Sequence, residues 1–159
     1  MSLARAPGAF RPSTYEVDFH RWTTDQAAAL RNAASAEIDW ENVAEEIESL
    51  GRSYRRALEN RFEILLAHLL KCLVQPERRT RSWDMTIAEQ RKQIASLIER
   101  NPSLGDLPRK NFARAYKDAV WRATRDSGLP ESAFPPACPF TIQEVLDPAF
   151  LPPAKERSP

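Results

Sequence analysis

The sequence predicts an all-α fold, arranged as an antiparallel bundle of four main helices with a proline-rich C-terminal clamp. The first observation is that the thirteen prolines leave three long windows free, residues 13–75, 77–101 and 109–129. The second is that apolar residues recur in each window every three to four positions, as on one face of a helix. No window has the sustained alternation of β-branched residues that predicts a strand.

The first two helices are expected over residues 17–34 and 39–74, and Asp39 is a favourable N-cap for the second. The apolar row of the second helix keeps its phase through Gly51, so we predict one continuous helix of about 50 Å. The alternative is a helix that ends at Leu50, with Gly51 as a left-handed cap. The row comprises Trp40, Val43, Ala44, Ile47, Leu50, Tyr54, Leu58, Phe62, Leu65, Leu69 and Cys72.

The third and fourth helices are bounded by caps and breakers. Ser82 is the expected N-cap of the third, which ends at Asn101 before a proline. Pro108 suits the first turn of the fourth, and Gly128 closes it. A capping-box pattern at residues 141–144 predicts one further short helix.

The remaining C-terminal segment is broken by prolines and carries three phenylalanines, Phe134, Phe140 and Phe150, that we expect to anchor it on the bundle. Residues 15–153 are interpreted as one helical domain. The segments 1–14 and 154–159 are expected to be flexible tails.

Composition limits the classes of function. The chain has 159 residues, a net charge of +1 and two cysteines. A charge this small gives no bulk preference for nucleic acid or an anionic membrane. Two cysteines do not make a disulfide framework, so reduced thiols and a cytoplasmic location are expected. The most apolar stretch, residues 64–74, is too short to span a bilayer, so no membrane association is expected.

Several motifs together resemble the bacterial family called domain of unknown function twenty-nine. The resemblance covers about residues 15–152 and implies a small helical protein without a known activity. The motifs are Asp39-Trp40-Glu41-Asn42, Glu45-Glu46-Ile47-Glu48, Leu50-Gly51-Arg52, His68-Leu69-Leu70-Lys71, Gln75-Pro76, Arg81-Ser82-Trp83, Thr86-Ile87, Gln90-Arg91, Cys138-Pro139-Phe140-Thr141, Asp147-Pro148 and Phe150-Leu151-Pro152.

A basic cluster with one aromatic residue is the main candidate for ligand binding. Its members share a helix end and the link that follows it: His68, Lys71, Gln75, Arg78, Arg79, Arg81 and Trp83. One interpretation is a solvated stripe whose arginines cap helix-end carbonyls. The other is an anion or phosphate pocket with bidentate arginine contacts, in a binding protein or an enzyme.

Charges are also segregated along the chain. Residues 36–50 carry six acidic side chains and no basic ones, whereas residues 108–125 carry six basic ones and a single acidic one. One interpretation is that the two segments neutralise each other as neighbouring helices. Alternatively, Glu41, Glu45 and Glu48 form a partner-binding face.

Metal and cofactor chemistry has little support. The only two histidines lie outside the Glu-x-x-His spacing of di-metal bundles, which leaves a mixed Glu46–His68 site as a weak alternative. No cofactor is predicted.

We expect a non-enzymatic protein-interaction or regulatory module whose partner is another protein. A small anionic ligand is the alternative, and nucleic-acid binding, which would need continuity between the arginine link and the fourth helix, is less favoured.

Overall fold

The structure, a computed structural model, describes residues 17–32 and 40–153, whose regular secondary structure is helical with no strand. The expected tails and the proposed cap Asp39 lie outside the described residues. The α-helices are α2 (Phe19–Arg31), α3 (Trp40–Val74), α4 (Arg81–Arg100), α5 (Leu107–Lys110), α6 (Phe112–Ser127) and α7 (Ile142–Leu146). Short 3-10 turns occupy Pro76–Arg78, Pro102–Leu104 and Glu131–Ala133.

Helix α3 runs unbroken for 35 residues, which confirms a continuous helix through Gly51. The glycine is there for packing and not for capping. A Cβ atom on Gly51 would lie 2.4 Å from Oγ1 of Thr23, a buried residue of α2. The two helices therefore approach each other closely at a point where only glycine fits without movement of Thr23.

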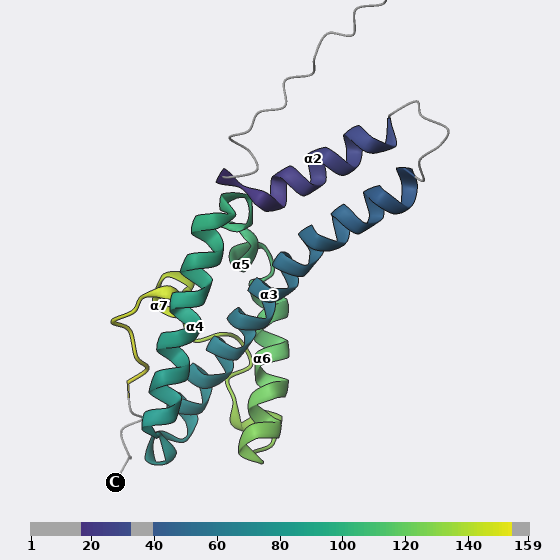
Figure 1. The fold of residues 1–159 in the computed structure, drawn as a ribbon. Coiled ribbons are helices and arrows are strands. Elements are labelled where there is room, and N and C mark those ends of the chain that lie inside the picture. The colour runs from purple at the N-terminus through teal and green to yellow at the C-terminus, as the bar shows by residue number, and fades with distance from the viewer. Residues whose placement is uncertain (1–16, 33–39, 154–159) are drawn as a thin grey trace, which may run out of the picture.

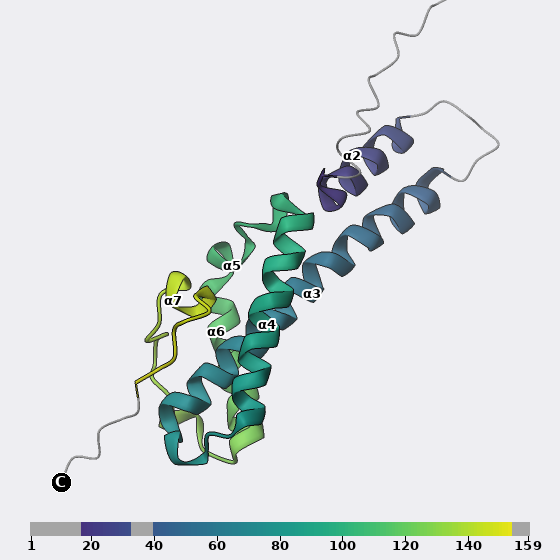
Figure 2. The same cartoon turned by 60° about the vertical axis from the view of Figure 1, so that its left-hand side comes forward.

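The four expected main helices do not form one common bundle. Helix α2 lies along the N-terminal half of α3, whereas α4 and α6 lie along its C-terminal half (Figures 1 and 2). The reason is length: α3 rises about 52 Å, while the 13 residues of α2 rise only about 20 Å. The α2–α3 hairpin thus projects beyond the part of the molecule formed by α4 and α6.

The main hydrophobic core lies where α3, α4 and α6 meet, and the C-terminal segment covers part of it. Leu65 and Leu69 of α3 are completely buried there, as the apolar row predicted. Ile87 and Ile94 come from α4. Burial of such side chains stabilises the fold by about 1.5–3 kcal/mol each.

Two helix starts differ from the sequence-based expectation. The N-cap of α4 is Thr80, whose hydroxyl accepts from the backbone N–H of Trp83. Ser82 instead lies in the first turn, because the preceding 3-10 turn ends early enough for Thr80 to take the extended cap conformation. The fourth main helix is divided at Asn111 into α5 and α6, although Gly128 closes it with φ 73°, as expected.

The C-terminal segment packs against the core through apolar and polar contacts. Phe134 and Phe140 are buried, and the ring of Phe140 lies 5.7 Å from that of Phe150. Buried Arg91 of α4 donates from Nε to the carbonyl of Val145 (2.8 Å). The capping box at the start of α7 is present. The action of this segment as a clamp stays a prediction.

The base of the hairpin is joined to the loop after α4 by a polar network. The carboxylate of Asp18 accepts from the backbone N–H of Ser103 (2.6 Å) and from its hydroxyl (2.8 Å). The backbone N–H of His20 donates to Oδ1 of Asn101, which is itself fully buried. These bonds hold the start of α2 in place, so that the rest of the helix can follow α3.

In the described ranges, every helix is too short or too polar to cross a lipid bilayer.

Candidate functional site

Lys71 is the centre of the predicted basic cluster. Its side chain is buried, with 5% of the residue exposed. The ammonium lies 3.3 Å from Oδ2 of Asp126 on α6 and 3.5 Å from Nε2 of His68. It also lies 4.8 Å from the centre of the Trp83 ring on α4. Lys71 therefore joins three helices, and its charge is compensated by a carboxylate and an aromatic face.

His68 is held in one orientation by the helix that carries it. Its Nδ1 lies 2.9 Å from the carbonyl oxygen of Ile64, so Nδ1 carries the proton and Nε2 faces the Lys71 ammonium as an acceptor. Burial is the largest cause that lowers the pKa of His68, and the positive charge of Lys71 lowers it as well. The neutral imidazole is thus the form that suits the folded protein.

This lowered pKa predicts that the protein loses stability in mild acid. The unfolded chain protonates histidine near pH 6.5 while the folded protein resists, so stability is complete above that pH and falls below it. His20 should also reduce stability in mild acid, because burial lowers its pKa too. Each histidine contributes at most about 1.4 kcal/mol per pH unit.

Urea denaturation at pH 7.5 and pH 5.5 measures the effect. His68→Gln and His20→Gln should each reduce the loss of stability between the two pH values, and the double variant should reduce it most. An equal loss in the double variant and the natural protein would contradict the assignment.

The rest of the basic cluster does not converge with Lys71. Gln75 is buried at the end of α3, whereas Arg78 and Arg81 are exposed. Nε of Arg79 donates to Oδ1 of Asp84 at 2.7 Å, which compensates its charge. The structure thus brings His68, Lys71 and Trp83 together and leaves the arginines on the surface around them. Because Lys71 and Gln75 are buried, the cluster is not a fully solvated stripe, and only its three arginines are exposed.

The acidic face of α3 is compensated by arginines from within the hairpin. Arg31 of α2 pairs with Glu48, and its Nε lies 3.4 Å from Oε1 of Glu41. Arg52 pairs with Glu45 and lies 3.6 Å from Glu48. The expected neutralisation by the basic residues 108–125 is therefore wrong for these glutamates, because α6 packs against the other half of α3.

The basic helix α6 instead forms ion pairs with the C-terminal half of α3. Nε of Arg122 donates to Oε1 of Glu63 at 2.7 Å. Near the end of α6, Arg125 lies 4.6 Å above the ring of Trp121, which is one of the exposed large apolar side chains. Asp126 on this helix and Asp84 on α4 place negative charge among the arginines at this end, which interrupts a continuous phosphate-binding track.

The metal alternative does not fit the geometry. Glu46 and His68 lie on the same helix, α3, and 22 residues of helical rise separate them by about 33 Å. One ion cannot reach both side chains. Over the part of the chain that the structure describes, no group of three or more histidine, cysteine or acidic side chains is placed to hold a metal.

The two cysteines are free thiols, and burial raises the pKa of each. Cys72 belongs to the apolar core, as the sequence indicated. A raised pKa keeps a thiol protonated at neutral pH and makes it a poor nucleophile.

One flank of the α2–α3 hairpin stays apolar and open. Val43 and Leu50, seven residues apart on α3, are 39% and 51% exposed. Ile47 lies between them and is half-buried. We call these three residues the apolar flank. It lies on the opposite side of α3 from the ion pairs of Arg31, because two helices cannot cover both sides of each other.

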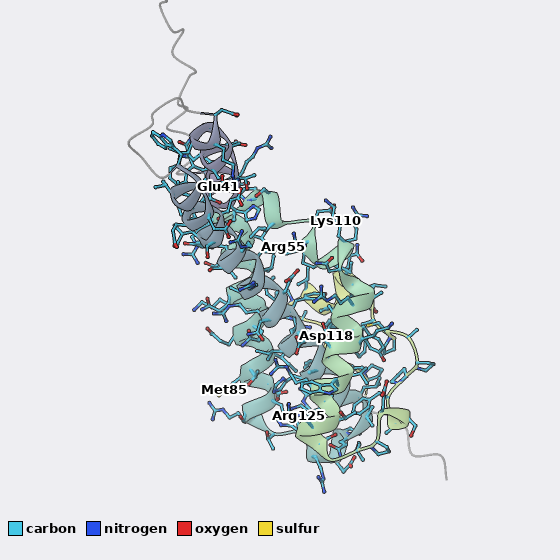
Figure 3. The ribbon with its side chains drawn as sticks, turned by 90° about the vertical axis from the view of Figure 1, so that its right-hand side faces the viewer. Glu41, Arg55, Met85, Lys110, Asp118 and Arg125 are labelled. Carbon is cyan, nitrogen blue, oxygen red and sulfur yellow. The ribbon has the colours of Figure 1, made fainter. Side chains whose placement is uncertain are left out.

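A cavity that sequence reasoning missed lies between α3, α5 and α6. It measures about 210 Å³, and Figure 3 looks onto this side of the molecule, with Arg55 of α3 and Asp118 of α6 labelled. Apolar side chains such as Phe62 and Pro108 meet charged ones such as Arg56 in its lining. The cavity depends on the division of the fourth helix at Asn111, which the sequence pattern did not predict. No local motif therefore marks the residues that line it.

The described residues form an all-helical fold, and comparison with a solved structure agrees with that fold class. The chain belongs to the family described as domain of unknown function DUF29, whose model matches residues 14–151. It is similar in structure to an alpha-helical protein of unknown function from Rhodospirillum rubrum, with a TM-score of 0.68 and 24% sequence identity. That match covers 88% of this chain and 93% of the other. No protein with a curated description matches.

Proposed function

We propose that the protein is a non-enzymatic protein-interaction module, and that its partner docks on the apolar flank of the α2–α3 hairpin. One observation carries the proposal: Val43 and Leu50 stay exposed on the outer side of a hairpin that projects from the core. Two large aliphatic residues at seven-residue spacing, with Ile47 between them, are typical of a seam that receives a second amphipathic helix.

The wider surroundings of the flank support helix docking. At the base of the hairpin, the Phe19 ring lies 5.2 Å from Tyr54 and stacks on Trp22 at 5.6 Å. Aromatic residues of this kind give a rigid edge against which a partner side chain can pack. A helix laid along the flank would add the third layer that α2 and α3 lack at this level.

In this proposal, the acidic residues Glu41 and Glu45 form the polar rim of the interface. Glu41 and Glu45 are exposed, and both already pair with arginines of the hairpin. Exposed ion pairs contribute little to stability, so they can exchange partners at small cost. Contacts of the partner with these glutamates would be sensitive to salt, whereas contacts with the apolar flank would not.

The chemistry of the basic cluster and of the two thiols supports a role without catalysis. The Lys71 ammonium faces Asp126, the His68 imidazole donates to a backbone carbonyl, and both thiols have raised pKa values. These groups stabilise the fold in ways that need no substrate. A bacterial cytoplasmic location is part of the proposal, since free thiols suit a reducing compartment.

Capture of a partner tests the proposal. The immobilised full chain is expected to retain a protein from an extract of its native cells, and that protein, once purified, should bind the chain directly. The double variant Val43→Ser, Leu50→Ser should reduce binding at least tenfold. It should fold normally, because both side chains are already exposed and surface substitutions change stability by about 0.5 kcal/mol or less.

Met85→Ser is the matched control, since Met85 is 62% exposed on α4, away from the hairpin. It should bind the partner as the natural protein does. Equal binding by the double variant and the natural protein would refute docking on the apolar flank.

A further inference from the structure

We propose that the cavity between α3, α5 and α6 binds a small amphipathic carboxylate, with its apolar body against Phe62 and Pro108 and its carboxylate at Arg56. This inference is independent of the proposed interaction at the hairpin, because the cavity is lined by other residues. It assigns a ligand class to a site that no sequence motif marks.

The size of the cavity sets the size of the ligand. At about 210 Å³ it is smaller than the cavities of 300–1,000 Å³ that hold drug-sized molecules, yet larger than a cavity of 150 Å³ that accepts benzene. One aromatic ring with a short polar chain fits this space. Leu58, Phe62, Leu107 and Pro108 supply an apolar wall for the ring.

The carboxylates that line the cavity already have partners. Glu59 accepts from Nδ2 of Asn111 at 2.8 Å and lies 3.4 Å from Nε of Arg55. Glu63 accepts from Nε of Arg122 at 2.7 Å. Because these acids are satisfied, they have little to gain from a cationic ligand.

The other charged residues of the lining are Asp118, Arg114 and Arg56. Asp118 lies 3.7 Å from Arg114 on the surface of α6. Arg56, which also lines the cavity, forms no ion pair with any residue in the described part of the chain. The lining itself holds three carboxylates, each with a partner, and two arginines, of which only Arg56 has no ion pair among the described residues. A ligand carboxylate at Arg56 would give this guanidinium a partner and can accept two N–H bonds from it.

Three probes that share a phenyl ring and differ in charge test the inference: 3-phenylpropanoate, its neutral amide, and phenethylammonium. Binding to the full chain is followed by NMR chemical shifts at constant ionic strength. For ligands of this size we expect dissociation constants in the millimolar range. The carboxylate should bind roughly three- to fivefold more tightly than the amide, as a partly exposed ion pair allows, and the ammonium most weakly.

Two variants and a control locate the binding. Arg56→Gln should remove the preference for the carboxylate while the amide binds as before. Ala115→Leu, which fills the cavity from α6, should weaken all three probes. Arg125→Gln removes an exposed arginine elsewhere on the same helix and should change nothing.

The inference is overturned if the ammonium binds as tightly as the carboxylate, if Arg56→Gln keeps the preference, or if none of the probes binds. Because these measurements use the isolated protein, their failure would leave the hairpin proposal unaffected, and capture of a partner would not rescue the cavity.

Discussion

Replacing Leu65 with alanine should lower the free energy of unfolding by about 2–5 kcal/mol. Leu65 is completely buried at the centre of the core between α3, α4 and α6. The change removes apolar contacts and leaves a cavity that the surrounding helices cannot fully close. For a domain with a total stability of about 5–15 kcal/mol, this is a large fraction.

Urea denaturation of the purified protein, followed by circular dichroism, measures the loss. The matched control is Leu50→Ala on the same helix, where the side chain is 51% exposed and the expected change is within about 0.5 kcal/mol. Similar losses for the two variants would contradict the assignment of Leu65 to the covered core and of Leu50 to the exposed flank of α3.

Replacing Gly51 with alanine should also be costly, although alanine favours helix formation by about 1 kcal/mol over glycine. The new methyl group would meet Oγ1 of Thr23 at 2.4 Å, and that hydroxyl donates to the backbone carbonyl of His20. Thr23 is fully buried, so it cannot move aside without disturbing α2. Overpacking of this kind costs about 1–3 kcal/mol, which exceeds the gain in helix propensity.

A double-mutant cycle separates the clash from other effects. In a Thr23→Ala background the obstructing oxygen is absent, so adding Gly51→Ala should be neutral or stabilising. The four proteins are compared by urea denaturation under one set of conditions. If Gly51→Ala destabilises both backgrounds equally, close approach of α2 and α3 is not the reason for the glycine.

Gly51 also shows what could be predicted from the sequence and why. The apolar row keeps its phase on both sides of the glycine, and that local periodicity was enough to predict a continuous helix. The reason for the glycine could not be predicted, because it depends on Thr23 in a different helix. Periodicity reports which face of a helix is apolar, but not which neighbour covers it.

The same limit explains the main difference in architecture. Val43 and Leu50 belong to the apolar row as clearly as Leu58 and Leu65 do, yet only the last two are buried. Helix α2 covers only one side of the N-terminal half of α3, and α4 and α6 lie along the other half, so no helix of the described residues covers the outer flank. A pattern of apolar residues therefore predicted the helix correctly and the common bundle incorrectly.

Part of the candidate site was accessible from the sequence. His68 and Lys71, three residues apart on one helix, were expected to be neighbours, and their side chains lie 3.5 Å apart. Asp126 could not be predicted as their companion, because it is 55 residues away in the chain. The cavity was missed for a similar reason, as its walls come from three separate helices.

Arg91 has a consequence for how this family can vary. Its guanidinium bonds to the main-chain carbonyls of Glu144 and Val145, and every amino acid offers such a carbonyl. Evolution can therefore exchange the side chains at those two positions without losing these bonds, whereas the arginine itself has no ready substitute. Relatives should therefore keep the arginine, while the side chains of the last short helix change only within what the buried Val145 and the capping-box Glu144 allow.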